Sequence, residues 1–192
     1  MKSVKDYYNL IIISIIGILI LPLSSLSQNT PSAQDKKVIA EFERQAQDYV
    51  KLRDKVEGKL PKLPNKATAE QIEEYKTNFQ KAVQSARLNS TQGEIFIPEA
   101  AQMFRQIIKI EFEPKERADL RKKILAAEVK TIPLKVNFPY PPEKEQLEMP
   151  PNLLLQLPQL PKQLRYRFVG SNFLLIDREN GLIIDFMTNA LP

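Results

Sequence analysis

The stretch LRYRFVGSNFLLIDRENGLIIDFM, residues 164–187, decides the fold of this chain. Basic residues alternate with apolar and aromatic ones in its first six positions, which is the period of a β-strand, and Gly170 marks a turn. The apolar run FLLI follows, and Asn180-Gly181, a strong hairpin signal, precedes the run LII. We therefore expect three strands in an antiparallel meander. Its last two strands are apolar on both faces, so we expect both faces to be covered, with helices as the obvious cover.

Three charged residues inside this meander, Arg165, Arg167 and Asp185, are the candidate binding residues. If both turns are two-residue loops, Asp185 lies opposite Ile176 and Ile176 opposite Arg165, which places Arg165 and Asp185 on one face. A change of one residue in the first loop would bring Arg167 to that position instead. We favour a structural role, in which Asp185 caps a turn or pairs with an arginine or a helix lysine, because an unpaired buried carboxylate is costly. The functional alternative is an acidic pocket residue with a shifted pKa.

Two amphipathic helices are predicted ahead of the meander. Residues 35–57 carry an apolar stripe at helical spacing with charges on the other faces, and Gly58 suits the C-terminal end of this helix. The sequence TAEQ at 68–71 matches the capping box that opens a second helix. The short connector over 59–64, with two prolines, makes an antiparallel helical hairpin the economical arrangement.

Two further helices are predicted between this hairpin and the meander. Pro98 suits the first turn of a third helix, and Pro114 starts a fourth helical stretch over residues 115–130. The side chains that we expect to face inward from them are Met103, Phe104, Ile107, Ile108, Ile110, Leu120, Ile124, Leu125 and Val129.

A proline-rich segment joins the helices to the meander. Eight of the 15 prolines fall between residues 133 and 161, and the many leucines there favour an ordered, extended wrap over a solvated linker. Candidate elements within it are a short strand over 134–138 and one or two helical turns over 151–157. The pattern L-P-x-L-P at 157–161 repeats that at 60–64. We favour leucines that pack on the core of the domain over a docking motif for an aromatic groove.

The N-terminal 27 residues have the layout of a secretory signal peptide. Two lysines precede a 12-residue apolar run over 10–21, Pro22 breaks the run, and Ser25 and Ser27 supply the small residues of a cleavage site. Such a run spans roughly 18 Å as a helix, short of the ~30 Å hydrocarbon core, so we favour cleavage after Ser27 over an uncleaved anchor. We expect Sec-type export to the periplasm or the outside, with membrane contact only before cleavage.

The amino-acid composition excludes several kinds of chemistry. The 192 residues include no cysteine and no histidine, which rules out disulfides, thiol nucleophiles, thiolate zinc sites and catalytic triads with histidine. The net charge is +5, but no basic stripe with interleaved aromatic residues points to nucleic acid. No D-x-D-x-D loop or glycine-rich phosphate loop is present, so we expect no metal and no cofactor.

Carboxylates are the catalytic device that remains suited to hydrolysis, as in glycosidases. The chain has 23 Asp and Glu residues, so chance pairs are numerous; we name no catalytic residue and lean against an enzyme. Asp177 opens the Asn-Gly turn, and we expect it to hold that turn. The carboxylates available for catalysis are those of Glu94, Glu99, Glu111, Glu113, Asp177 and Asp185.

The C-terminal end carries three short motifs, YRFVG at 166–170, LIIDF at 182–186 and NALP at 189–192. In these motifs the chain resembles a group of bacterial exported proteins that share an aromatic-Arg-Phe-Val-Gly strand and a terminal Asp-Phe … Ala-Leu-Pro. The Pro/Leu-rich wrap and IFIP at 95–98 look similar too, so the likeness covers the C-terminal half. The resemblance implies an exported bacterial protein, and it supplies no catalytic residues because no activity is assigned to the group.

Together these features predict an α+β protein, in which a helical hairpin and two further helices pack on a small three-stranded antiparallel sheet. We expect a non-enzymatic binding or interaction protein of the cell envelope, with an envelope component or a protein as its partner. The alternative is a carboxylate-dependent hydrolase of envelope glycans, which two carboxylates about 5–9 Å apart in one pocket would favour. The predicted parts are a signal peptide (1–27), a flexible linker (28–34) and a single domain (35–192), made of helices (35–131), the wrap (132–163) and the meander (164–192).

Overall fold

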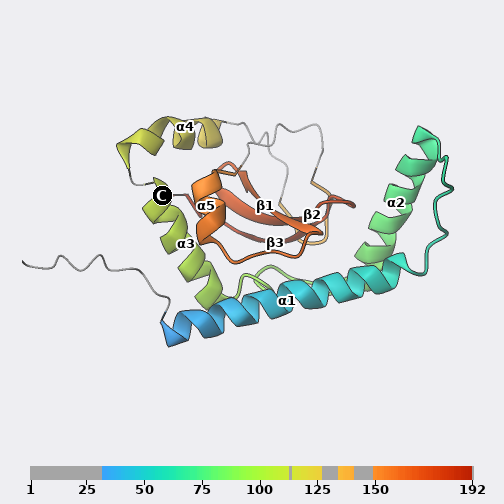
Figure 1. The fold of residues 1–192 in the computed structure, drawn as a ribbon, viewed down its shortest axis with the longest axis horizontal. Helices are drawn as coiled ribbons and strands as arrows, with labels where there is room; N and C mark the ends of the chain where they lie inside the picture. The colour runs from blue at the N-terminus through green and yellow to red at the C-terminus, as the bar shows by residue number, and fades with distance from the viewer. Residues whose placement is uncertain (1–31, 113, 127–133, 141–148, 192) are drawn as a thin grey trace, which may run out of the picture. The chain divides into compact units, whose positions relative to one another are not determined.

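The computed structural model describes residues 32–112, 114–126, 134–140 and 149–191 (Figure 1). The predicted α+β class is confirmed, with helices packed on one three-stranded antiparallel sheet. The elements run in the order α1 (Ala33–Glu57), α2 (Ala69–Ala86), α3 (Pro98–Phe112), the 3-10 turn η2 (Lys115–Arg117), α4 (Ala118–Ala126), α5 (Pro151–Gln156), β1 (Leu164–Val169), β2 (Asn172–Asp177) and β3 (Ile183–Met187).

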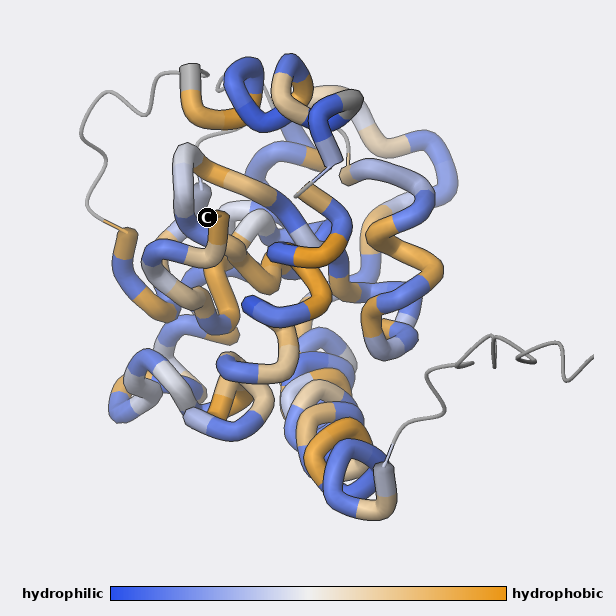
Figure 2. The backbone as a smooth tube through the Cα atoms, turned by 90° about the vertical axis from the view of Figure 1, so that its left-hand side faces the viewer, coloured by the Kyte–Doolittle hydropathy of each residue, from blue (hydrophilic) through white to orange (hydrophobic). Residues whose placement is uncertain are grey.

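The first two helices begin at capping boxes. In α2 the Thr68 side chain accepts a hydrogen bond from the Gln71 N–H and the Gln71 side chain accepts one from the Thr68 N–H, as predicted. Ser32 and Asp35 form the same pair at the start of α1, so this helix begins at Ala33, inside the stretch expected to be a linker. Such caps satisfy N–H groups that have no partner within the helix. Figure 2 shows α1 nearly end-on, with hydrophobic and hydrophilic residues recurring along it.

The sheet follows the predicted meander, and its first turn has the predicted length. Gly170 and Ser171 form a two-residue turn, with Val169 opposite Asn172 and Arg165 opposite Ile176. Gly170 has a φ of 56°, a left-handed conformation that glycine adopts without strain.

The second turn is longer than predicted, and this changes the position of Asp185. The Asp177 N–H donates to the carbonyl of Leu182 at 3.0 Å, so four residues form the loop. Ile176 then lies opposite Ile183, and after a bulge Leu175 lies opposite Asp185. The expectation that Asp185 faces Ile176 and shares a face with Arg165 is therefore wrong, because the loop and the bulge shift the register.

One face of the sheet packs against the helices. Phe42 of α1, Phe104 of α3 and Phe173 of β2 are fully buried. The ring centroids of Phe42 and Phe104 are 4.9 Å apart, those of Phe104 and Tyr166 5.8 Å, and those of Tyr166 and Phe173 5.2 Å. Figure 1 shows α1 running along the sheet with α3 beside it. This aromatic cluster joins the helices to the meander.

The other face of the sheet is covered differently from the prediction. Among the described residues, Val136 and Tyr140 pack there against Leu174, Ile176 and Ile183. The segment 134–140 forms no strand of its own, and its backbone instead binds the edge of β3. The bonds run from Asn137 N to Ile183 O (2.8 Å), from Ile183 N to Phe138 O (2.9 Å) and from Tyr140 N to Gly181 O (2.9 Å).

The remaining helix predictions are confirmed with local corrections. Pro98 opens α3, Phe104 and Ile108 are buried, and α5 forms in the predicted place. The prediction that Ile110 and Leu125 face inward is wrong, since they expose 50% and 45% of their surface. Gly58 ends α1 with a right-handed φ of −62°, so the left-handed conformation typical of a terminal glycine is not used.

Several predictions fall outside the described residues. These are the signal peptide over 1–27, the inward position of Val129 and, within the wrap over 132–163, residues 132–133 and 141–148. Among the helices that the structure describes, none combines the length and the apolar character needed to cross a membrane.

Candidate functional site

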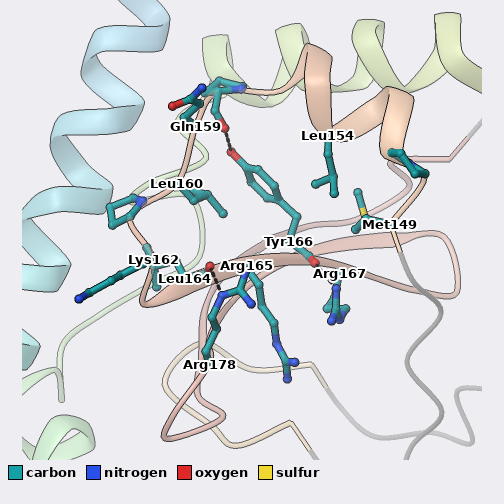
Figure 3. Close-up of a pocket in the computed structure, with 13 residues that line it drawn as sticks. Met149, Leu154, Gln159, Leu160, Lys162, Leu164, Arg165, Tyr166, Arg167 and Arg178 are labelled. Carbon is teal, nitrogen blue, oxygen red and sulfur yellow. Dashed lines mark hydrogen bonds between the residues drawn. The ribbon is translucent and has the colours of Figure 1, made fainter.

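A hollow of about 570 Å³ lies along β1 (Figure 3). One wall comes from α5 and from residues 158–162, which lead into β1, and the rest comes from β1 itself and from Arg178 after β2. The leucines of the repeated L-P-x-L-P pattern explain how this wall is held. Leu157 is buried in the core and Leu160 packs partly against it, as the favoured interpretation of the pattern requires. In the copy at 60–64, Leu60 packs partly on the core, but Leu63 exposes 36% of its surface, so the prediction is wrong for Leu63.

The hollow lies across the outer edge of the sheet. Four consecutive residues of β1, from Leu164 to Arg167, line it. Successive side chains of a strand point to opposite faces, so a hollow confined to one face would contact only every second residue. β1 is an outer strand of the sheet. Figure 3 shows Tyr166 on one side of the strand and Arg165 on the other.

Four cationic side chains line the hollow: Lys162, Arg165, Arg167 and Arg178. Arg178 donates from Nε to the carbonyl of Leu164 at 2.8 Å, which turns it back toward β1 from the end of β2. Arg167 donates to the carbonyl of Tyr166 at 3.2 Å. None of the described residues that line the hollow is an aspartate or a glutamate. The described side chains that line the hollow therefore carry a net positive charge.

Arg165 stands out among these cations. Its Nε is buried and has no hydrogen-bond partner in the part of the chain that the structure describes. Burial lowers the pKa of Arg165, and the neighbouring charge of Arg178 lowers it further. An anion beside this guanidinium would be favourable, because it would offset the repulsion between the two arginines.

The other side of the hollow is apolar. Met149, Leu154 and Leu160 line it, and Figure 3 shows the Tyr166 ring between Leu160 and Leu154. The hydroxyl of Tyr166 donates to the carbonyl of Pro158 at 3.0 Å, and burial raises the pKa of Tyr166 well above its ordinary value. This hydrogen bond fixes the entry segment above β1. The site thus has an apolar side and a cationic side, separated by the backbone of one strand.

Asp185 belongs to the interior of the fold and not to this hollow. Its Oδ1 accepts from the N–H groups of Gly93 (2.9 Å) and Phe186 (2.8 Å), and its Oδ2 from those of Ile95 and Phe96 (both 2.8 Å). Burial raises the pKa of Asp185, and the four N–H groups oppose that rise. The carboxylate caps the turn that leads into α3, which is one of the structural roles foreseen for it.

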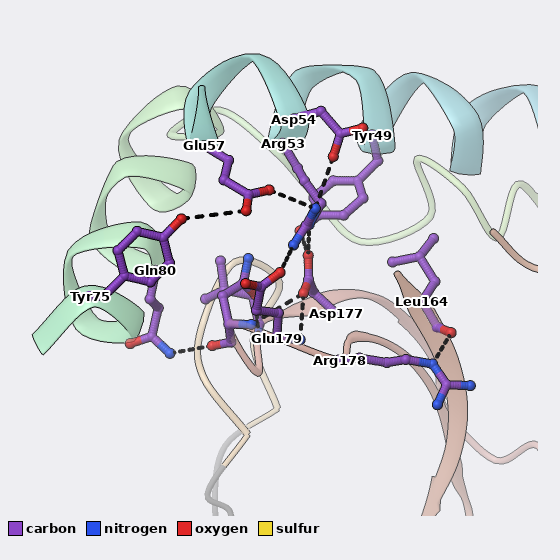
Figure 4. A network of polar contacts seen from close by, with 12 residues as sticks. Tyr49, Arg53, Asp54, Glu57, Tyr75, Gln80, Leu164, Asp177, Arg178 and Glu179 are labelled. Carbon is purple, nitrogen blue, oxygen red and sulfur yellow. Dashed lines mark hydrogen bonds and ion pairs between the residues drawn. The ribbon is translucent and has the colours of Figure 1, made fainter. Parts of the chain in front are cut away.

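Asp177 holds its turn as predicted and also anchors α1 (Figure 4). Its Oδ1 accepts from the N–H groups of Glu179 (2.9 Å) and Asn180 (3.2 Å). Its Oδ2 accepts from the Tyr49 hydroxyl at 2.7 Å and from Arg53 Nε at 2.9 Å. Arg53 also pairs with Glu179, Asp54 and Glu57. Burial by itself would lower the pKa of Arg53, but these carboxylates raise it overall.

A second, smaller hollow of about 290 Å³ contains two carboxylates. Asp54 and Glu57 line it together with Tyr75. Both carboxylates bond to Arg53, at 2.9 and 3.1 Å, and Glu57 also accepts from the Tyr75 hydroxyl at 3.4 Å. These partners hold the two groups in place as members of the ion-pair network. In the described ranges, no group of acidic residues is arranged to hold a metal ion.

The structure thus brings two of the three candidate binding residues together. Arg165 and Arg167 line the hollow, and Asp185 does not. Lys162 and Arg178 also line the hollow, but they were not identified from the sequence as candidate binding residues. Lys162 comes just before β1 in the chain, and Arg178 comes just after β2. The only sign of Arg178 in the sequence is a positive charge next to the Asn-Gly turn. Its contact with β1 depends on the register between β1 and β2, which the sequence does not determine.

No protein family, curated protein or solved structure matches this chain.

Proposed function

We propose that this protein is a non-enzymatic binding protein of the bacterial cell envelope, and that the hollow along β1 takes an anionic partner. One observation carries this proposal. Lys162, Arg165, Arg167 and Arg178 line one hollow whose described lining includes no acid, and among the described residues the buried Arg165 Nε has no hydrogen-bond partner.

The chemistry of arginine favours a carboxylate or a phosphate as the anionic group. A guanidinium presents its N–H groups in a planar fork that matches two oxygens of such an anion. Leaving a buried N–H without a partner costs about 1–3 kcal/mol. Because the Nε of Arg165 is buried, a carboxylate or phosphate oxygen would recover that cost only if the side chain turned toward it. The charge of the guanidinium is the more direct source of affinity.

The envelope location rests on the N-terminal sequence. The apolar run over residues 10–21, with lysines before it and small residues after it, supports Sec-type export. The mass of the chain recovered from the producing cell tests this part. Loss of residues 1–27 is expected, and a chain that retains Met1 would contradict cleavage.

The alternative, a carboxylate-dependent glycan hydrolase, has weaker support. Such an enzyme needs two carboxylates facing one substrate. The larger hollow has none among its described lining residues, and in the smaller one Asp54 and Glu57 are both bonded to Arg53. The distribution of carboxylates therefore favours binding over hydrolysis.

Neutralising the hollow tests the proposal. We would measure the binding of a dye-labelled oligoglutamate peptide by fluorescence anisotropy at low and at physiological ionic strength. The double variant Lys162→Gln, Arg165→Gln should bind at least about tenfold more weakly than the wild type, a loss of ~1.4 kcal/mol. The affinity of the wild type should also fall as salt increases.

A variant with the same loss of charge is the control. Lys36 and Lys37 are exposed in the first turns of α1 and do not line the hollow. Lys36→Gln, Lys37→Gln should bind the peptide as the wild type does. Equal losses in both double variants, or no binding by the wild type at low ionic strength, would overturn the proposed site.

A further inference from the structure

The register of β1 shows which of its backbone groups face the hollow. In a hairpin with a two-residue turn the flanking residues, here Val169 and Asn172, form a hydrogen-bonded pair. Arg167 and Arg165 alternate with Val169, so their N–H and C=O groups also point to β2. The groups of Phe168, Tyr166 and Leu164 therefore point away from β2, to the outer side of β1.

The contacts of Leu164 confirm this assignment. Its N–H donates to the carbonyl of Pro161 at 2.9 Å, and its carbonyl accepts from Arg178 Nε at 2.8 Å, both outside the pairing with β2. The described residues provide no backbone acceptor for the outward N–H groups of Tyr166 and Phe168. Tyr166 and Phe168 expose only 4% and 6% of their surface, so these two N–H groups become available to a further strand only when the side chains over β1 shift.

The two sides of this edge differ in chemistry, as two faces of a strand would. Arg165 and Arg178 lie on one side, and Leu154 and Leu160 lie on the other (Figure 3). Leu154 and its neighbour Leu155 expose 46% and 85% of their surface, so the apolar side continues to the protein surface. An extended segment paired with β1 would place alternate side chains on these two sides. Its acidic residues would meet the arginines and its apolar residues would meet the leucines.

A second copy of the chain is a poor occupant. Pairing two β1 strands would bring the Arg165 and Arg167 side chains of one copy close to those of the other, and like charges on paired strands are destabilising. Charge complementarity instead requires a strand that carries acids where β1 carries arginines. The occupant is thus a segment of a different protein.

We propose that the anionic partner is an extended protein segment with alternating acidic and apolar residues, which pairs with β1 as a fourth strand. This inference rests on the proposed function and adds the shape and the sequence pattern of the partner. The outward N–H groups of Tyr166 and Phe168 would donate backbone hydrogen bonds to the segment. The cationic and apolar sides of the hollow would favour a segment in which acidic and apolar residues alternate.

Peptides of equal composition separate pairing from simple attraction of charge. One short dye-labelled peptide alternates glutamate with leucine, and the other carries the same residues in two blocks. The alternating peptide should bind the full-length protein at least about tenfold more tightly. Two N-methylated forms of the alternating peptide would be compared, one methylated at the leucines and the other at the glutamates. One form should not bind and the other should bind as the unmodified peptide does, because only one set of peptide N–H groups faces β1. Amide exchange at Tyr166 and Phe168 should slow when it binds.

The possible results distinguish the two proposals. If the alternating and block peptides bind equally and neither slows exchange at Tyr166 and Phe168, the strand-pairing inference is overturned, while binding of an anionic partner stands. If both N-methylated peptides bind with the affinity of the unmodified peptide, strand pairing is likewise overturned. If neither peptide nor oligoglutamate binds, the anionic site itself is refuted, and the strand inference falls with it.

Discussion

Asp185 is a fully buried carboxylate that accepts hydrogen bonds from four backbone N–H groups. Its place within the run LIIDFM predicts burial and a structural role, but the partners come from residues 93–96, far away in the sequence. No local pattern identifies them. The residue that looks most functional in the sequence is therefore the one that fixes the entry to α3.

Replacing Asp185 by Asn should destabilise the fold by about 3 kcal/mol, because the new NH2 group faces two N–H donors that lose their acceptor. The free energy of unfolding from urea titration measures this. Asp119→Asn, at an exposed position of α4, is the control and should change stability by less than about 1 kcal/mol. Equal stability of the two variants would show that the carboxylate is not needed to hold this turn.

Tyr49 makes the stability of the folded protein depend on pH in the alkaline range. Burial, and then the charge of Asp177, raise the pKa of Tyr49 well above its ordinary value. The unfolded chain loses the tyrosine proton near pH ~10 while the folded protein keeps it, so stability falls as pH rises above that value. Tyr49→Phe should make the fall of Tm between neutral and alkaline pH less steep. Tyr75→Phe, at a half-buried position, should change the slope less; indistinguishable slopes for the wild type and Tyr49→Phe would contradict this account.

At the scale of elements, Arg53 joins α1 to the turn between β2 and β3. Its side chain is 4% exposed and bonds to Asp177, which is fully buried. Arg53 is one basic residue among several in a charged helix, and its partner is Asp177, far along the chain. The sequence predicts the helix and the turn separately, and it contains no signal that links them.

Arg53→Met should cost about 3–5 kcal/mol, because it leaves the Asp177 carboxylate buried without its cation. Arg44→Met is a matched control on the same helix, since Arg44 also pairs with two acids but its side chain is 55% exposed. The control should lose about 1 kcal/mol or less. Thermal and urea unfolding of both variants would measure the difference, and similar losses would mean that the buried pair contributes no more than a surface pair.

The elements themselves were largely predictable, because their signals are local. The capping box at Thr68, the proline at position 98 and the alternation in β1 each determine a boundary within a few residues. The bulge in β3 and the cover of the second face by 134–140 were not predictable in this way. Both depend on which distant segment supplies the hydrogen-bond partners, and several registers satisfy the same hydrophobic pattern.

At the scale of the whole molecule, the candidate site depends on the pairing of β1 with β2. Arg165 and Arg167 are recognisable in the sequence as basic residues of a strand, but their function depends on β1 lying at the edge of the sheet. The pairing of β1 with β2 also places Arg178 beside Leu164, and α5 lines the apolar side of the same hollow. The sequence identifies half of the cations, and only the tertiary arrangement gathers them around one hollow.

Amide chemical-shift mapping tests this site most directly. Isotope-labelled protein would be titrated with oligoglutamate at low ionic strength, and the backbone amide signals followed by NMR. The largest shifts should fall on residues 162–168 and on Arg178. Shifts spread evenly over the exposed lysines, or centred on the hollow beside Asp54 and Glu57, would contradict binding at the edge of β1.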